Sequence, residues 1–171
     1  NSTEVLRLSA LNDATVRRVV SLLPNITKLS VIVDRITFRE LRSTIKLFRY
    51  YDQRLTSLSM SIQLKCARVN QKQEMYIELL RTINDSLISL TYLSLELDLH
   101  DEIKKPIDLP MLGRLHHFRY SSFASPFFLC DSLRKYATNN DALHTIALLG
   151  VVFPFEQYLA FCALDASLRQ R

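Results

Sequence analysis

The segment LISLTYLSLELDL, residues 87–99, has an apolar pattern that recurs along the chain. The shared core is apolar-x-x-Leu-x-apolar, and the other copies are LPNITKLSVIVD (23–34), LTSLSMSIQL (55–64), LGRLHHFRYSSF (112–123), ALHTIALLGVVF (142–153) and a truncated TEVLRLSAL (3–11). Aligned on one apolar position, the copies fall at Leu6, Leu29, Leu58, Leu93, Phe118 and Ile146, and are therefore 23, 29, 35, 25 and 28 residues apart. This regularity predicts an internally repeated fold.

Each copy predicts a β-strand. From residue 92 to residue 99 every second residue is a leucine, and the residues between them are Tyr92, Ser94, Glu96 and Asp98. Successive side chains of a strand point to opposite faces, so one set enters the core and the other, mostly polar, faces solvent.

The segments between the copies carry apolar stripes at helical spacing, over residues 16–23, 38–48, 76–87, 129–137 and 155–166. Thr37-x-x-Glu40 has the spacing of a capping box and predicts that a helix begins there. The spacing of 35 residues between the second and third full copies is longer than the others. We interpret residues 65–74, KCARVNQKQE, as an exposed basic insertion that lengthens this repeat.

Strands that alternate with helices at this spacing predict an α/β leucine-rich-repeat solenoid, an arc with about six parallel inner strands and outer helices. Residues 1–171 make one such domain. No capping repeat precedes residue 3, so we expect the chain to be a fragment of a longer protein.

Composition and motifs argue against an enzyme. With two glycines in 171 residues, the chain has no glycine-rich phosphate loop, and we expect no cofactor. Adjacent His116 and His117 would point to opposite faces of a strand, so we expect no metal site and no catalytic centre. The net charge of +5 comes from lysines and arginines spread along helices and loops, which does not favour nucleic acid. No apolar run has the length of a membrane span.

The cysteines, Cys66, Cys130 and Cys162, are widely separated and odd in number, which favours a reducing compartment. Cys162 lies on the stripe Phe155, Tyr158, Leu159, Cys162 and Ala166, so we predict a buried thiol. Asn-x-Ser/Thr triplets begin at Asn1, Asn25 and Asn84; chance occurrence and glycosylation are both open.

The segments LLPNITKLSVIVD, SLISLTYLSLELDLHD and DALHTIALL resemble the irregular, helix-rich leucine-rich repeats of F-box-type proteins, which are related to the ribonuclease-inhibitor-like class. In that family an F-box binds a ubiquitin-ligase adaptor, and the repeats select the substrate. The chain departs from the family in two respects. It has no recognisable F-box, and the usual asparagine after each strand is replaced by Asp34, Gln63, Asp98, Phe123 and Val151.

The resemblance implies a protein-recognition module for substrates of a ubiquitin ligase, cytoplasmic or nuclear, whose adaptor binds an F-box outside this chain. The alternative is a general leucine-rich-repeat scaffold or receptor segment, such as an innate-immune sensor, with no ubiquitin link. In either case we expect a protein partner and neither nucleic acid nor membrane.

The outward strand positions are the candidate binding residues, because in a parallel solenoid they line the concave face. They are Arg7, Lys28, Ser30, Ser57, Ser59, Tyr92, Ser94, Glu96, His117 and Arg119. Tyr92 and Arg119 are the expected anchors, since tyrosine and arginine are enriched in binding hot spots.

Overall fold

The computed structural model describes residues 11–64, 69–97, 111–121, 135, 138, 140–149 and 155–170. Within them, five parallel strands form one sheet, and their order in the sheet is their order in the chain. The strands are β1 (Lys28–Ile36), β2 (Ser57–Leu64), β3 (Tyr92–Leu97), β4 (His117–Ser121) and β5 (Thr145–Leu149). The helices are α1 (Asp13–Leu22), α2 (Phe38–Tyr50), α3 (Val69–Ser86) and α5 (Phe155–Arg169). The predicted α/β class with a parallel sheet is confirmed. The copy at residues 3–11, except Leu11, and nearly all of the helix expected over 129–137 lie outside the described residues.

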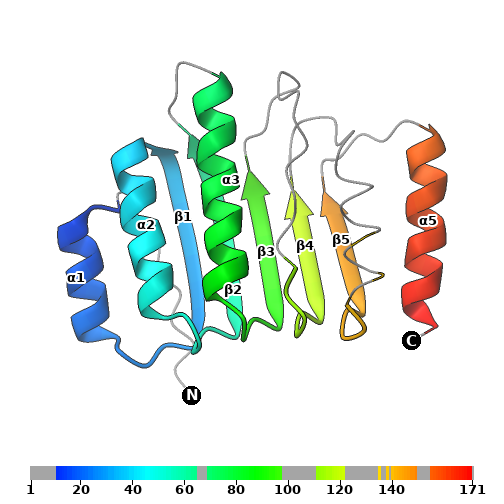
Figure 1. The fold of residues 1–171 in the computed structure, drawn as a ribbon, viewed down its shortest axis with the longest axis horizontal. Helices are drawn as coiled ribbons and strands as arrows, with labels where there is room; N and C mark the ends of the chain where they lie inside the picture. The colour runs from blue at the N-terminus through cyan, green and yellow to red at the C-terminus, as the bar shows by residue number, and fades with distance from the viewer. Residues whose placement is uncertain are drawn as a thin grey trace.

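The helices form a layer on the sheet. Figure 1 shows α2 and α3 in front of the strands, α1 beside α2, and α5 at the other end, beyond β5. Neighbouring helices α1, α2 and α3 are in contact, and α5 contacts β5. Because parallel neighbours need a crossover, α2 joins β1 to β2 and α3 joins β2 to β3.

The register of the sheet is the one predicted from the repeats. Residues aligned across the copies are direct neighbours in the sheet and are all buried: Leu29, Leu58, Leu93, Phe118 and Ile146. A second buried row follows: Val31, Met60, Leu95 and Tyr120. Burial of each such side chain contributes about 1.5–3 kcal/mol, and a slip of one residue would turn every one of them to solvent. The leucine rows therefore fix the register.

The predicted start of α2 is also confirmed. Glu40 N–H donates to Thr37 Oγ1 at 3.4 Å, and Glu40 Oε2 accepts from Thr37 N–H at 2.8 Å, which closes the capping box. Asn12 caps α1 in a similar way, because its Oδ1 accepts from Thr15 N–H at 2.9 Å. Both caps satisfy backbone donors that a helix start leaves without partners.

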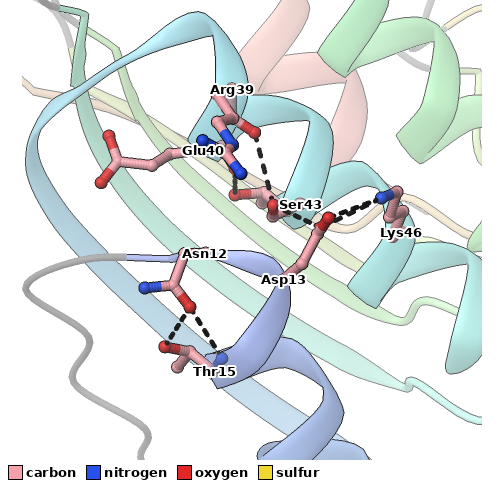
Figure 2. Close-up of polar contacts among 8 residues, drawn as sticks. Asn12, Asp13, Thr15, Arg39, Glu40, Ser43 and Lys46 are labelled. Carbon is pink, nitrogen blue, oxygen red and sulfur yellow. Dashed lines mark hydrogen bonds and ion pairs between the residues drawn. The ribbon is translucent and has the colours of Figure 1, made fainter.

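A polar contact joins α1 to α2. Figure 2 shows Asp13 at the start of α1 facing Ser43 and Lys46 on α2. Asp13 Oδ1 accepts from Lys46 Nζ at 3.0 Å and from Ser43 Oγ at 2.9 Å. The hydrogen bonds from Lys46 and then from Ser43 hold the pKa of the Asp13 carboxyl below its usual range.

The expected surface insertion at 65–74 is wrong for its second half. Residues 65–68 lie outside the described part, but α3 begins at Val69 and continues to Ser86. Lys72 and Gln73 are buried, at 8% and 6% exposure. They precede the buried Tyr76 and Leu80 at helical spacing, so their stems extend the same packed face. The long repeat thus contains a longer helix.

The buried face expected for α5 is wrong as well. Tyr158 and Leu159 are each 52% exposed, and Cys162 is exposed, so it is not a core thiol. The packed side carries Leu168, with Phe161 and Leu164 against the core. A hydrogen bond with Cys162 raises the pKa of the exposed Tyr158. Apolar residues of α5 lie on all sides of the helix, so helical spacing alone does not predict which side is buried.

Candidate functional site

The side chains that alternate with the buried rows define a second surface, which we call the open face. It points away from the core, and its described side chains are exposed or half-buried. Across β1 to β5 the sheet register places them in three rows. The first row is Lys28, Ser57, Tyr92, His117 and Thr145; the second is Ser30, Ser59, Ser94, Arg119 and Ala147; the third is Ile32, Ser61, Glu96, Ser121 and Leu149.

The structure brings the predicted binding residues together on this face. Arg7 lies outside the described residues, and the other nine all belong to the three rows. The first row holds Lys28, Ser57, Tyr92 and His117, the second holds Ser30, Ser59, Ser94 and Arg119, and the third holds Glu96. The sequence therefore predicted which side of the sheet these residues occupy.

An aromatic pair lies near the middle of the first row. Tyr92 and His117 are direct neighbours on β3 and β4, and their ring centroids are 6.5 Å apart at an interplanar angle of 47°. Tyr92 is half-buried and His117 is exposed. Small side chains flank the pair in its row, Ser57 on one side and Thr145 on the other. The two rings thus offer an apolar contact area beside small, polar side chains.

Three of the side chains that the structure describes on the open face are charged. Arg119 is exposed between Ser94 and Ala147, and Lys28 is exposed on β1. Glu96 is exposed in the third row. None of the three forms an ion pair with another residue in the part of the chain that the structure describes; the ion pairs found there join Asp13 to Lys46 and Asp165 to Arg169.

Each strand after β1 is entered through the same backbone contact. The carbonyl of Thr27 accepts from Thr56 N–H at 2.8 Å and from Ser57 N–H at 3.2 Å. The same pair of bonds recurs at the next strands, with acceptor carbonyls at Thr56, Thr91 and His116. The hydroxyls of Thr56 and Thr91 add a bond of 3.1 Å to the preceding threonine carbonyl. The copies are therefore structural equivalents as well as sequence equivalents.

Histidines replace threonine at the last two of these positions. The ring centroids of His116 and His144 are 5.6 Å apart, and those of His116 and His117 are 6.5 Å apart. We expected the two rings on opposite faces of a strand, and this is wrong. His116 lies just before β4, and both it and His117 are exposed with their rings close together. Among the described residues, no three His, Cys, Asp or Glu side chains are placed to hold a metal ion.

Two buried polar groups that join neighbouring repeats were not found from the sequence. Tyr51 donates its hydroxyl to the carbonyl of Leu23 at 2.7 Å. Asn140, 3% exposed, donates Nδ2–H to the carbonyls of Leu112 (2.8 Å) and Leu115 (3.3 Å). Leucine stands six residues before the aligned position in three of the copies, and Asn140 stands there in the last. That substitution is the signal that would have found it.

A smaller bridge starts from Asn84 near the end of α3. Its Oδ1 accepts from Met111 N–H at 2.7 Å, and its Nδ2 donates to Asp85 at 3.0 Å. The side-chain amide of this Asn-x-Ser triplet is thus used in holding the next repeat.

No family model matches the chain, and no curated protein and no solved structure matches it. In the described part, none of the helices combines the length and the apolar character needed to cross a membrane.

Proposed function

We propose that the chain is a leucine-rich-repeat solenoid and that its open face is a non-enzymatic protein-recognition surface. One observation supports this proposal most directly: five parallel strands in chain order have helices on one side and mostly polar, accessible side chains on the other. Parallel sheets in most α/β proteins are covered on both faces. Repeat solenoids are the class that leaves the inner face of such a sheet available to partners.

The repeated entry contact supports the same proposal. Stacked repeats that contact only their neighbours should show one contact many times, and the bonds that begin at Thr27 recur through His116. The Tyr92–His117 pair and Arg119 supply the side-chain types that dominate protein interfaces.

The narrower proposal is substrate recognition within a ubiquitin ligase, in the cytoplasm or nucleus, with the adaptor bound by an F-box outside this chain. The alternative is a leucine-rich-repeat scaffold or receptor segment with no ubiquitin link. Both use the open face and neither requires a cofactor.

Quantitative affinity purification of the whole protein from its own cells tests both levels. The variant with Tyr92→Ala and Arg119→Ala should lose specific partners, whereas Arg81→Ala, an exposed change on α3, should retain them. A ubiquitin-ligase adaptor should co-purify with the native protein and with both variants, because it does not bind this face. An unchanged partner set in the double variant would contradict the recognition surface, and absence of every ligase component would remove the ubiquitin link.

A further inference from the structure

We infer that the open face takes an extended acidic protein segment, with one carboxylate on Arg119, a second on Lys28, and an apolar or aromatic side chain on the Tyr92–His117 pair. This inference rests on the proposed function of the open face and adds the chemistry of its partner.

The charges of the first two rows carry the inference. Lys28 and Arg119 are exposed cations, and no carboxylate belongs to either row. Neither cation has an ion-pair partner among the described residues. A guanidinium surrounded by Ser94 and Ala147 offers its fork of donors to a ligand carboxylate, which can accept two hydrogen bonds from it. The excess of Lys and Arg (22) over Asp and Glu (17) in the whole chain also attracts an acidic partner.

The sheet geometry sets the spacing of the two acids. Lys28 lies in the first row on β1 and Arg119 in the second row on β4. They are three strand spacings apart across the sheet, about 14 Å at roughly 4.8 Å per spacing, and two residues, about 7 Å, apart along it, so their backbones are about 16 Å apart. An extended segment advances about 3.4 Å per residue, so its two carboxylates should be about five residues apart. The segment then crosses the strands and passes over the rings between the two cations.

The side chains between the two cations and the rings are small, which favours an extended segment over the edge of a bulky domain. Between Lys28 and the rings stands Ser57, and between Ser30 and Arg119 stand Ser59 and Ser94. Serine hydroxyls can donate to and accept from the peptide groups of a chain lying flat on them. A ring or aliphatic side chain of the segment can pack on the half-buried Tyr92 and on His117.

Glu96 limits which part of the open face the acidic segment can occupy. Among the open-face side chains that the structure describes, it is the one carboxylate, and it belongs to the third row with Ser61 and Ser121. An acidic segment is repelled there and is attracted to the first two rows. The segment is therefore confined to the half of the open face nearer the strand starts.

A displayed library of random dodecapeptides, selected on the whole chain, tests the inference. We expect retained peptides to carry Asp or Glu near an aromatic residue, with a second acid about five residues away. Their affinity should fall as salt is raised, because exposed charges are screened. Tyr92→Ala and Arg119→Gln should each weaken a selected peptide by about thirtyfold, the scale of a hot-spot truncation. Selection on Arg119→Glu should yield peptides in which a basic residue replaces the acid near the aromatic residue, whereas the acid that contacts Lys28 is kept.

Arg81→Glu on α3 is the matched control, since it changes the charge of the protein equally on the helical side and should leave the selection unchanged. Melting temperatures check that each variant folds, and Arg119→Gln replaces Arg119→Glu if charge reversal unfolds the chain. Peptides that need Tyr92 but carry no acid, or ignore both changes at Arg119, would overturn the inference and leave the recognition surface standing. If no retained peptide depends on Tyr92, the recognition surface itself is wrong.

Discussion

Ser94 and Leu95 are neighbours in β3, yet they belong to two surfaces of opposite character. Leu95 is fully buried, with Met60 and Tyr120 beside it on the adjacent strands. Ser94 lies half-buried on the open face, between Ser59 and Arg119. The buried rows fix the register of the sheet. The open-face residues are therefore not needed for the register and are available for recognition. Changes on the two faces should therefore have separable effects, on stability for the buried face and on binding for the open face.

Leu95→Ala should produce the largest loss. Removing most of a fully buried side chain at the centre of the sheet should lower the free energy of unfolding by about 2–5 kcal/mol. Ser94→Ala, one residue away on the open face, should change it by less than about 0.5 kcal/mol. Urea unfolding of both variants measures the difference, and equal losses would mean that the two faces are not distinct.

Asn140→Ala tests a polar bridge between repeats on the buried side. The buried carbonyls of Leu112 and Leu115 would lose the amide donor that they share, which should lower the free energy of unfolding by about 1–3 kcal/mol. Asn25→Ala is the control, because Asn25 is exposed in an equivalent turn. Thermal unfolding compares the two; equal melting temperatures would show that water replaces the bridge at no loss.

Thr37→Ala should have an intermediate effect at the start of α2. It removes the acceptor for Glu40 N–H and should lower the free energy of unfolding by about 1 kcal/mol. Thr37→Ser keeps the hydroxyl and should recover most of that loss. If serine and alanine proved equally damaging in chemical unfolding, the methyl group and not the cap would be responsible.

Asp13→Asn should give the smallest effect, and one that depends on pH. The pKa of Asp13 is lowered in the folded chain by its bonds to Lys46 and Ser43, so the folded state binds this proton less readily than the unfolded state. The ionised carboxylate then adds stability at neutral pH, and that contribution is lost as the pH falls through the folded pKa. The melting temperature of the native chain should exceed that of Asp13→Asn at neutral pH, and the gap should close in acid. A gap that persists in acid would point to packing instead of charge.

The register and the open face could be predicted from the sequence because they depend on one strong signal. A period of two from Tyr92 to Leu97 leaves only one register that buries the leucines, and the copies at Leu29 and Leu58 repeat it. The cap at Thr37 is a similar local signal, since both partners lie within one helical turn.

The remaining features depend on contacts that a local pattern does not contain. Lys72 is charged, so its segment resembles a loop, yet its stem is buried once α3 packs against the core. On α5 two apolar stripes are available, and packing selects Leu168 and not Tyr158. Asn140 is recognisable only after the repeats are stacked, because its partners, Leu112 and Leu115, belong to the preceding repeat.

Adjacent residues of one strand serve packing and recognition separately, and thiol labelling can distinguish the two roles. With Cys66, Cys130 and Cys162 replaced by alanine, single cysteines are introduced by Ser94→Cys and Leu95→Cys, and their reaction with a small thiol reagent is timed under native conditions. The account predicts rapid labelling at position 94, protection of that thiol by a bound acidic peptide, and labelling at position 95 only as fast as the chain unfolds. Comparable rates at the two positions, or faster labelling at position 95, would contradict it.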